Sequence, residues 1–376
     1  MVYGLRPRRI TLNGVFLAAA GFFFFALVLG AEAQAQTDWQ KRWAEVLAAA
    51  KKEGTVVVAA SPSPDTRAEM EPLFLKQYGF KLEYLGLAGA ESTARVEREA
   101  VAGRSTLDIL LSGNTELFNL HPAGRLEPVK DKLLLPEAID LSKWRGNKLK
   151  FNDPEERYLL QTMEYILPDV FVNRTIVKPG ELTSWKDLLK PQYKGKIASF
   201  DPRRPGQGQA VAAFLLNLYG PDFIKALFVD QQVIYTGDRR QMGDWLARGT
   251  YPIGIAVATR EVEEAKQLGI PIERPNFPDA PGGVTGGSGT IKIVKNAPHP
   301  NAAAVFLNWF LTREAQEIFQ RTNAMVSRRK DVGLKGIPDY VVPKEGLKYL
   351  DTYSYDYTVE YIPKSQKALA GLLGGR

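Results

Sequence analysis

Short apolar stretches alternate with amphipathic ones along most of the chain. The first amphipathic stretch after residue 37 carries Trp43, Val46 and Leu47 at helical spacing and predicts a helix that ends at Gly54. The next six residues, TVVVAA at 55–60, predict a buried strand. The same reasoning predicts the rest of this first region: strands at 81–87 and 107–111, and helices at 65–78 and 91–102.

A second region of the same kind follows the stretch 165–173 (YILPDVFVN), which reads as a long strand broken by Pro168. The pattern predicts helices at 185–189, 207–219, 222–228, 240–247 and 260–268, and strands at 196–200, 232–235, 253–257 and 270–273. A glycine-rich segment, 281–289, then precedes a strand at 290–294. The next helix, which we expect Asn301 to cap, carries four large apolar residues: Val305, Phe306, Trp309 and Phe310.

Strands that alternate with helices at this spacing indicate βαβ units and parallel sheets covered on both faces. The fold class is therefore α/β. About 340 residues exceed one comfortable core, which favours two lobes. We predict lobe one from 37–166 plus 290–376 and lobe two from 167–289. The stretch 165–173 would cross between them and 290–294 would return, forming a two-strand hinge.

The first 35 residues have the composition of a secretory signal peptide. Arg6, Arg8 and Arg9 precede an apolar run at 15–30, and small-x-small cleavage sites follow at Ala33 and Ala35. The alternative is a retained membrane anchor, but the run is slightly shorter than the ~20 residues that span a bilayer. We therefore expect cleavage and a periplasmic protein, with the twin-arginine export route left open by Arg8-Arg9.

Composition narrows the function further. The chain has no cysteine, which excludes disulfides, thiolate metal sites and a lipid-modified N-terminal cysteine. Removing the signal segment from 49 basic and 42 acidic residues leaves 46 and 41, an excess of five positive charges. No block of like charges accompanies that excess, so we expect no nucleic-acid partner. A mild positive potential attracts anions, and we expect a monomer.

Several motifs occur together in one order. They are the helix motif at 43–54 with its following strand, LDIL at 107–110, PAGRL at 122–126, WKDLL at 185–189, KGKI at 194–197, APHPNAAA at 297–304 and FLT at 310–312 with Ala315-Gln316. The ordered set resembles the extracellular solute-binding proteins of ATP-driven importers (periplasmic binding proteins of type 2), in the branch of ferric-ion, thiamine and phosphorylated-compound binders. The resemblance implies two lobes that close on a solute and deliver it to a membrane permease, without catalysis.

The clearest candidate for ligand contact is the loop DPRRPGQGQ at 201–209, between a predicted strand and a helix. Free amides at a helix start favour an anion, and Gly206 and Gly208 let it approach the backbone. Arg203 and Arg204 would donate charged hydrogen bonds to the anion, and the amides from Gly206 to Gln209 would cradle it. Arg239 is a further candidate because it follows the strand at 232–235. The plain alternative is an exposed loop with solvated arginines.

Lobe one offers only short polar side chains. Ser61, Ser63, Ser112 and Asn114 follow predicted strands, and Asn173 (with Thr175) follows the predicted crossing. In parallel sheets the ligand crevice lies at the carboxyl ends of the strands. Such residues are also common turn formers, so a structural role is the alternative for each.

Ferric binders of this plan use paired tyrosines after a strand that corresponds here to 253–257. This chain reads AVATR at 256–260, without tyrosine, and Tyr353, Tyr355 and Tyr357 near the C-terminus are the remaining option for iron. We expect His121 and His299 to be structural, and no metal or cofactor to be bound. We find no P-loop, G-x-S-x-G or H-E-x-x-H motif. The favoured solute is a small organic anion (a carboxylate, phosphonate or sugar phosphate), with a ferric carrier and an exported hydrolase as alternatives.

Overall fold

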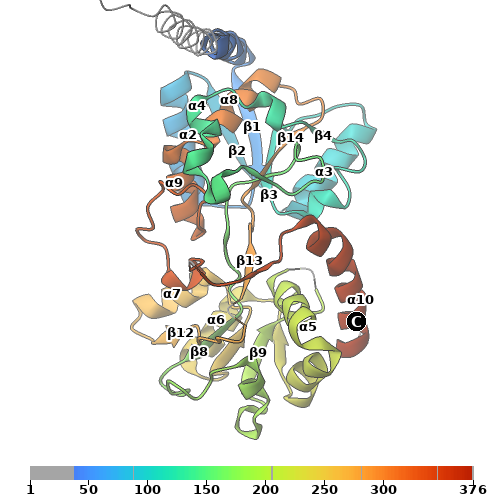
Figure 1. Ribbon diagram of the computed structural model, residues 1–376, viewed down its shortest axis with the longest axis vertical. Coiled ribbons are helices and arrows are strands. Elements are labelled where there is room, and N and C mark those ends of the chain that lie inside the picture. Colours follow the sequence, from blue (N-terminus) through green and yellow to red (C-terminus); the bar gives the residue numbers. More distant parts are fainter. Residues whose placement is uncertain (1–37, 88, 205, 281, 345, 375–376) are drawn as a thin grey trace, which may run out of the picture.

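The computed structural model describes residues 38–374 apart from 88, 205, 281 and 345. The predicted signal peptide lies outside these residues. Figure 1 shows two α/β lobes, one above the other, joined by extended segments. The α/β class and the two-lobed plan predicted from the sequence are confirmed.

Lobe one is built on a seven-stranded sheet in the order β2-β1-β3-β14-β6-β5, with β4 paired to β14. Its strands are β1 (Thr55–Ala60), β2 (Lys81–Gly86), β3 (Ile109–Ser112), β4 (Leu126–Glu127), β5 (Lys150–Phe151), β6 (Leu160–Gln161) and β14 (Thr290–Val294). Strands β1 to β3 are parallel, as predicted, whereas β14 runs antiparallel to β3. The strand predicted at 290–294 therefore completes this sheet and is not a crossing between lobes.

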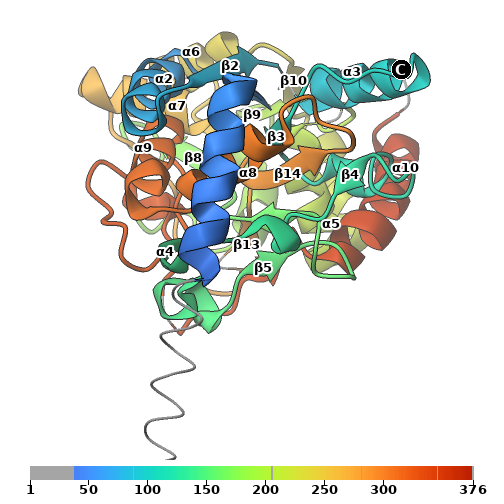
Figure 2. The ribbon, with the colours of Figure 1, turned by 90° about the horizontal axis from the view of Figure 1, so that it is seen from above.

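Helices cover this sheet. They are a helix over 38–53, α2 (Pro64–Tyr78), α3 (Gly89–Val101), α4 (Pro136–Ile139), α8 (Pro300–Phe310) and α9 (Arg313–Asn323). The helix 38–53 lies across the top of lobe one, as Figure 2 shows, and Trp43, Val46 and Leu47 pack on the core as predicted. Helix α8 begins at Pro300 and His299 is its N-cap; Asn301 lies inside the first turn, where its side chain donates to Glu53. The predicted cap at Asn301 is therefore wrong.

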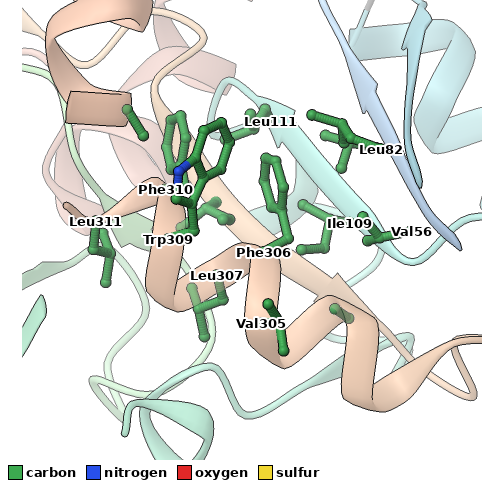
Figure 3. Close-up of a cluster of buried hydrophobic side chains, with 14 of the residues drawn as sticks. Val56, Leu82, Ile109, Leu111, Val305, Phe306, Leu307, Trp309, Phe310 and Leu311 are labelled. Carbon is green, nitrogen blue, oxygen red and sulfur yellow. The ribbon is translucent and has the colours of Figure 1, made fainter. Parts of the chain in front are cut away.

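The core of lobe one is aromatic. Phe306, Trp309 and Phe310 on α8 are fully buried beside Ile109 and Leu111 of β3 (Figure 3). Burial of each such side chain contributes about 1.5–3 kcal/mol. This rigid packing fixes the ends of β1 and β3, where the candidate ligand loops begin.

Lobe two has a five-stranded sheet in the order β10-β9-β11-β8-β12. Its strands are β8 (Val170–Asn173), β9 (Ile197–Phe200), β10 (Ile234–Thr236), β11 (Ile253–Ile255) and β12 (Ile272–Glu273), and its helices are α5 (Gln207–Lys225), α6 (Arg239–Arg248) and α7 (Thr259–Gln267). Strands β9, β10 and β11 are parallel and β8 is antiparallel to β11. Each parallel strand is followed by one of these helices, so the three helix starts lie at the same edge of the sheet.

Helix α5 and the π-helical turn η7 (Ala226–Asp230) form a stretch that is long and apolar enough to cross a membrane. Half of that stretch is buried inside the protein. Gly220, with φ 79° and ψ 179°, and Pro221 interrupt the helix. The burial of Val211, Phe214 and Leu215 accounts for the apolar composition, because these residues form the core of lobe two.

Shorter turns connect the main elements. The 3-10 turns are η1 (Thr115–Leu117), η2 (Lys130–Lys132), η3 (Leu141–Lys143), η4 (Arg145–Asn147), η5 (Trp185–Leu189), η6 (Pro191–Tyr193) and η8 (Asp339–Val341). The helix predicted at 185–189 is thus a 3-10 turn. Ser184 caps it and Asp187 completes a capping box.

The hinge is a separate three-stranded sheet, ordered β15-β13-β7, of β7 (Tyr165–Ile166), β13 (Gly283–Thr285) and β15 (Leu350–Asp351). Pro168 separates β7 from β8, so the predicted break in this stretch is confirmed. Strand β13 makes the return crossing. The glycines that follow it pack closely, because a side chain at Gly286 would meet the ring of Tyr353 and one at Gly287 the ring of Tyr165.

The C-terminal region crosses between the lobes three further times within the described residues. Tyr340 descends to lobe two, where it packs on Phe171 and binds Glu263. After β15, Tyr355 packs against lobe one. The π-helical turn η9 (Asp356–Tyr361) then leads into α10 (Ile362–Leu373), which packs beside α5 and places Leu369 in the core of lobe two (Figure 1).

We call residues 350–373 the C-terminal strap. The sequence-based assignment of 290–376 to lobe one is wrong for α10, which packs in lobe two. An amphipathic pattern indicates that a helix has a buried face, but it does not indicate which lobe buries that face.

Candidate ligand-binding site

The candidate site lies where helix starts of the two lobes face each other. In lobe one α2 follows β1, and in lobe two α7 follows β11 on the side that faces lobe one (Figure 1). The pKa of the Arg260 guanidinium, in the first turn of α7, is raised by Glu264 first and also by Glu261 and by Asp65 of α2. Asp65 has the weakest influence of the three, and solvent screens it because the Arg260 side chain is exposed.

A buried carboxylate organises the loop that precedes α5. Asp201 is 4% exposed and accepts two bonds from the Arg203 guanidinium, at 2.9 Å from Nε and 3.1 Å from Nη2. Burial alone would raise the pKa of Asp201, but the hydrogen bonds from Arg203 outweigh it and the pKa is lowered. The Arg203 guanidinium also lies over the ring of Tyr235, 4.9 Å from its centroid. Arg203 is thus fixed in one position and largely neutralised.

Arg204 is the less compensated of the two arginines. Its Nε lies 3.4 Å from Asp201 Oδ2, and 55% of its side chain is exposed. Gly237, between β10 and α6, leaves room for it, since a Cβ there would approach Arg204 Nη1 to 3.4 Å. Two guanidinium groups share one carboxylate, so this loop keeps a net positive charge.

The start of α5 reaches the same loop. Its N-cap is Gly206, with φ 142°, and no side chain caps the helix. Gly208 lies against the backbone of Phe200 and Asp201 so closely that a Cβ would overlap the Phe200 carbonyl. Gln207 is turned inward to the carbonyls of Pro168 and Val257. Gln209 is the partner of Gln366 on the C-terminal strap.

Arg239 begins α6, which Asp238 caps through the amide of Gln241. It lines a hollow of about 530 Å³ between α6 and α7. Arginine and carboxylate side chains are mixed there: Arg239, Arg240 and Arg260 lie among Asp238, Asp244 and Glu261. Arg239 is exposed and lies at the predicted edge of the sheet. The carboxylates around it offset its positive charge.

In lobe one, Ser61 and Ser63 lie between β1 and α2. Ser63 is the N-cap of α2 and accepts bonds from the amide and hydroxyl of Thr66, so its alternative role as a turn former is confirmed. The Ser61 carbonyl accepts from Tyr84. The hydroxyl of Ser61 remains in the partly exposed loop beside Ser63.

Ser112 and Asn114 are buried in a polar network. Ser112 donates to Glu116 Oε1 at 2.6 Å and accepts from Lys292 Nζ at 2.6 Å, and Lys292 and Glu116 are both fully buried. Asn114 donates to the Tyr353 carbonyl and accepts from Asn152. These bonds connect lobe one to the strap, so the polar atoms of Ser112 and Asn114 are used within the protein and are not offered to a solute.

Asn173 is also structural. It is 2% exposed, donates to the carbonyls of Leu246 and Ala247, and accepts from Thr175. Its amide thus closes the turn after β8 and has no exposed polar atom for a solute.

The C-terminal tyrosines do not form an iron site in this structure. The Tyr353 hydroxyl donates to the Gly287 carbonyl, and Tyr357 packs on Tyr361 at 4.9 Å between ring centroids. Burial raises the pKa of Tyr353, which disfavours the phenolate that binds iron. Both tyrosines therefore belong to the packing of the strap.

The two histidines differ. His299 Nδ1 contacts the buried Asp108 at 2.9 Å, which fits the predicted structural role. His121 instead lies near Asp153 and Glu155, a cluster that sequence spacing did not indicate. Sequence reasoning also gave no role to Asp201, although it lies two residues before the first of the two arginines that it holds.

Comparisons with known proteins agree with this architecture. Residues 55–322 match the family model described as bacterial extracellular solute-binding protein. A Haemophilus influenzae protein described as uncharacterized is 25% identical over 284 residues, covering 73% of this chain and 77% of that protein.

Three solved structures illustrate the fold. The Trichodesmium protein IdiA (FutA), in complex with iron and citrate, is 20% identical with a TM-score of 0.64 and covers 86% of this chain and 100% of its own. AfuA from Actinobacillus pleuropneumoniae, with fructose-6-phosphate bound, is 20% identical with a TM-score of 0.62 and covers 86% and 99%. The ferric iron-binding protein A of Mannheimia haemolytica, in an open conformation, is 16% identical with a TM-score of 0.62 and covers 85% and 98%. With its fold and the family match in agreement, the chain belongs to the bacterial extracellular solute-binding proteins.

Proposed function

We propose that this protein is the periplasmic solute-binding component of an ABC importer and that it captures a small organic anion between its lobes. Binding proteins of this family deliver their solutes to such permeases. The observation that supports an anion is the loop before α5, where Arg203 and Arg204 share one carboxylate, Asp201. One positive charge remains uncompensated beside an uncapped helix start.

The residues take different parts in this proposal. Arg204, half-exposed, and Arg239 contact the anion, and the first amides of α5 at Gly206 and Gly208 receive its oxygens. Arg203 orients the loop by its paired bonds to Asp201 and its contact with Tyr235. Ser61 and Ser63, between β1 and α2, are the lobe-one residues that we assign to hydroxyl contacts with the solute on closure.

Two neighbouring structures hold chemically different cargo, iron with citrate in one and a sugar phosphate in the other. At 20% sequence identity these two structures support the fold alone. The choice between an iron ligand and an organic anion therefore rests on the arginines and tyrosines of this chain. The segment after β11 has no tyrosine, and Tyr353 and Tyr357 are committed to the strap. The chemistry therefore favours an anion without iron.

The test is a thermal-shift and calorimetric screen of the mature protein against fructose 6-phosphate, citrate, succinate, inorganic phosphate and ferric citrate. A ligand at 100 times its dissociation constant adds about 2.7 kcal/mol of stability. For the ligand that binds best, Arg203→Ala/Arg204→Ala should weaken binding at least tenfold, since charged hydrogen bonds contribute about 1.5–3 kcal/mol.

The matched control is Lys51→Ala/Lys52→Ala, which removes two adjacent exposed charges from the remote helix 38–53. Equal affinity in the arginine and lysine double variants would refute the anion cradle. A visible charge-transfer absorbance with ferric ion, and no shift with the iron-free anions, would indicate a ferric carrier. Turnover of ester or phosphate reporters would indicate a hydrolase.

A further inference from the structure

A second group of polar side chains, one imidazole and two carboxylates, lies outside the candidate site, on lobe one. His121 belongs to the turn after η1, and Asp153 and Glu155 belong to the loop between β5 and β6. One ligand atom from each of the three lies within 4.8 Å of the other two. His121 Nε2 is 3.2 Å from Glu155 Oε2.

The first carboxylate of the group is held in place by the backbone. Asp153 is 3% exposed, and its Oδ1 accepts from the amides of Tyr158 and Leu159 at 3.0 and 2.7 Å. Its Oδ2 accepts one amide, that of Arg157, at 2.8 Å. An ionised carboxylate has about four acceptor positions, so Oδ2 keeps one for a further partner.

The imidazole is also oriented. The His121 ring meets the Tyr158 ring edge-on, with 5.1 Å between centroids, and its Nε2 faces Glu155. A histidine–glutamate pair would explain two of the three side chains, but it leaves the Asp153 carboxylate beside Glu155 with like charge. Arg157, the cation on the same loop, is hydrogen-bonded to Asp131, and its charge acts on Asp153 only more weakly. A cation between the two carboxylates and the imidazole would remove this repulsion.

We propose that His121, Asp153 and Glu155 bind one divalent transition-metal ion, with zinc as the preferred ion. One imidazole and two carboxylates suit zinc, which accepts mixed nitrogen and oxygen ligands at tetrahedral geometry. Calcium and magnesium favour sites made of oxygen alone. Glu155 is half-exposed, which gives the ion a route from solvent and leaves the fourth position to water.

The bound ion connects two loops that the backbone does not pair directly. Asn152, which precedes Asp153, donates to Asn114, and Asn114 binds the carbonyl of Tyr353 on the strap. Metal binding at this site therefore stabilises the end of lobe one that anchors the strap. This proposal stands independently of the identity of the solute.

The experiment uses tag-free mature protein, treated with chelator and titrated with zinc chloride by calorimetry. The chain has two histidines, so a long-range ¹H–¹⁵N spectrum contains two imidazole spin systems. We expect one equivalent of zinc to bind and to shift the His121 signals while those of His299 stay in place. His121→Gln and Glu155→Gln should each weaken zinc binding at least tenfold.

Glu156→Gln is the matched control, because it removes the same charge from the exposed neighbour of Glu155, which lies outside the group. It should bind zinc as tightly as the unmodified protein. The proposal is overturned if millimolar zinc leaves the His121 signals unchanged, or if Glu155→Gln and Glu156→Gln bind equally. Tighter binding of calcium or magnesium than of zinc would likewise overturn it.

Discussion

Gln366 of the C-terminal strap donates a hydrogen bond to Gln209 in the first turn of α5, with 2.9 Å between Nε2 and Oε1. The same strap receives a bond from Asn114 of lobe one at the carbonyl of Tyr353. One segment thus contacts both the helix that carries the proposed anion cradle and a strand end of the opposite lobe. Any change in the angle between the lobes has to be accommodated by the part of the strap between these two contacts.

The strap should contribute measurably to the stability of lobe two. Leu369 is 1% exposed and lies in the core of that lobe. Leu369→Ala should lower the free energy of unfolding by about 2–5 kcal/mol, because it removes buried methyl groups and leaves a cavity. Urea unfolding followed by tryptophan fluorescence measures this. The control, Leu347→Ala, alters a half-exposed leucine and should change stability by no more than about 0.5 kcal/mol.

Gly208 should be irreplaceable at the start of α5. A Cβ at this position would overlap the Phe200 carbonyl, which is backbone and has little freedom to move. Gly208→Ala should therefore lower the melting temperature and displace the loop that holds Arg203 and Arg204. Gly371→Ala provides the comparison, because open space surrounds Gly371 on helix α10. That variant should be neutral or stabilising by up to about 1 kcal/mol, and equal loss in both variants would contradict the steric argument.

The buried pair of Lys292 and Glu116 should matter most when only one partner is removed. Burial lowers the pKa of Lys292, and the adjacent Glu116 acts in the opposite direction. Lys292→Met leaves Glu116 buried without its cation and should cost about 3–5 kcal/mol. Lys292→Met/Glu116→Gln should recover part of that loss in a chemical denaturation series. A double variant less stable than the single one would show that the pair is not the source of the effect.

Asp187 should make stability depend on pH in the acid range. The Thr183 amide, followed by Lys190, lowers its pKa from 3.8 to about 2 in the folded protein. The unfolded chain therefore takes up a proton at higher pH than the folded one. The contribution of Asp187 is present above pH 4 and is lost as the pH falls toward 2. Unfolding measured between pH 2 and 5 should show a shallower loss for Asp187→Asn than for the unmodified protein, and parallel curves would contradict this.

Local patterns predicted the elements but not the partners of their polar residues. The longer strands of both sheets and the break at Pro168 were predicted, because apolar runs and proline act over a few residues. The two-residue strands β4, β5 and β6 of lobe one were not predicted, because they are too short to show a pattern. Ser112 and Asn114 were expected at a ligand site because they follow a strand. Their partners, Lys292 and Tyr353, are 180 and 239 residues away in sequence, so only the folded structure shows that these polar groups are already satisfied.

The arginine loop was identified more completely, because its chemistry is local. Asp201, Arg203 and Arg204 lie within four residues, and the glycines that follow them require close backbone approach. The division of roles between the arginines was not predictable. It depends on Tyr235 and Gly237, which the pairing of β10 with β9 brings beside the loop.

The positions of β14 and Leu369 also determine when each lobe can be completed as the chain is synthesised. Strand β14, at 290–294, lies in the interior of the sheet of lobe one, and Leu369 belongs to the core of lobe two. A growing polypeptide consequently lacks an interior strand of the lobe-one sheet until residue 294 has been made, and part of the core of lobe two until residue 369 has been made. Contacts between residues so distant in sequence form slowly. The nascent chain therefore keeps apolar surface exposed until these segments have been added, in a form that chaperones can bind.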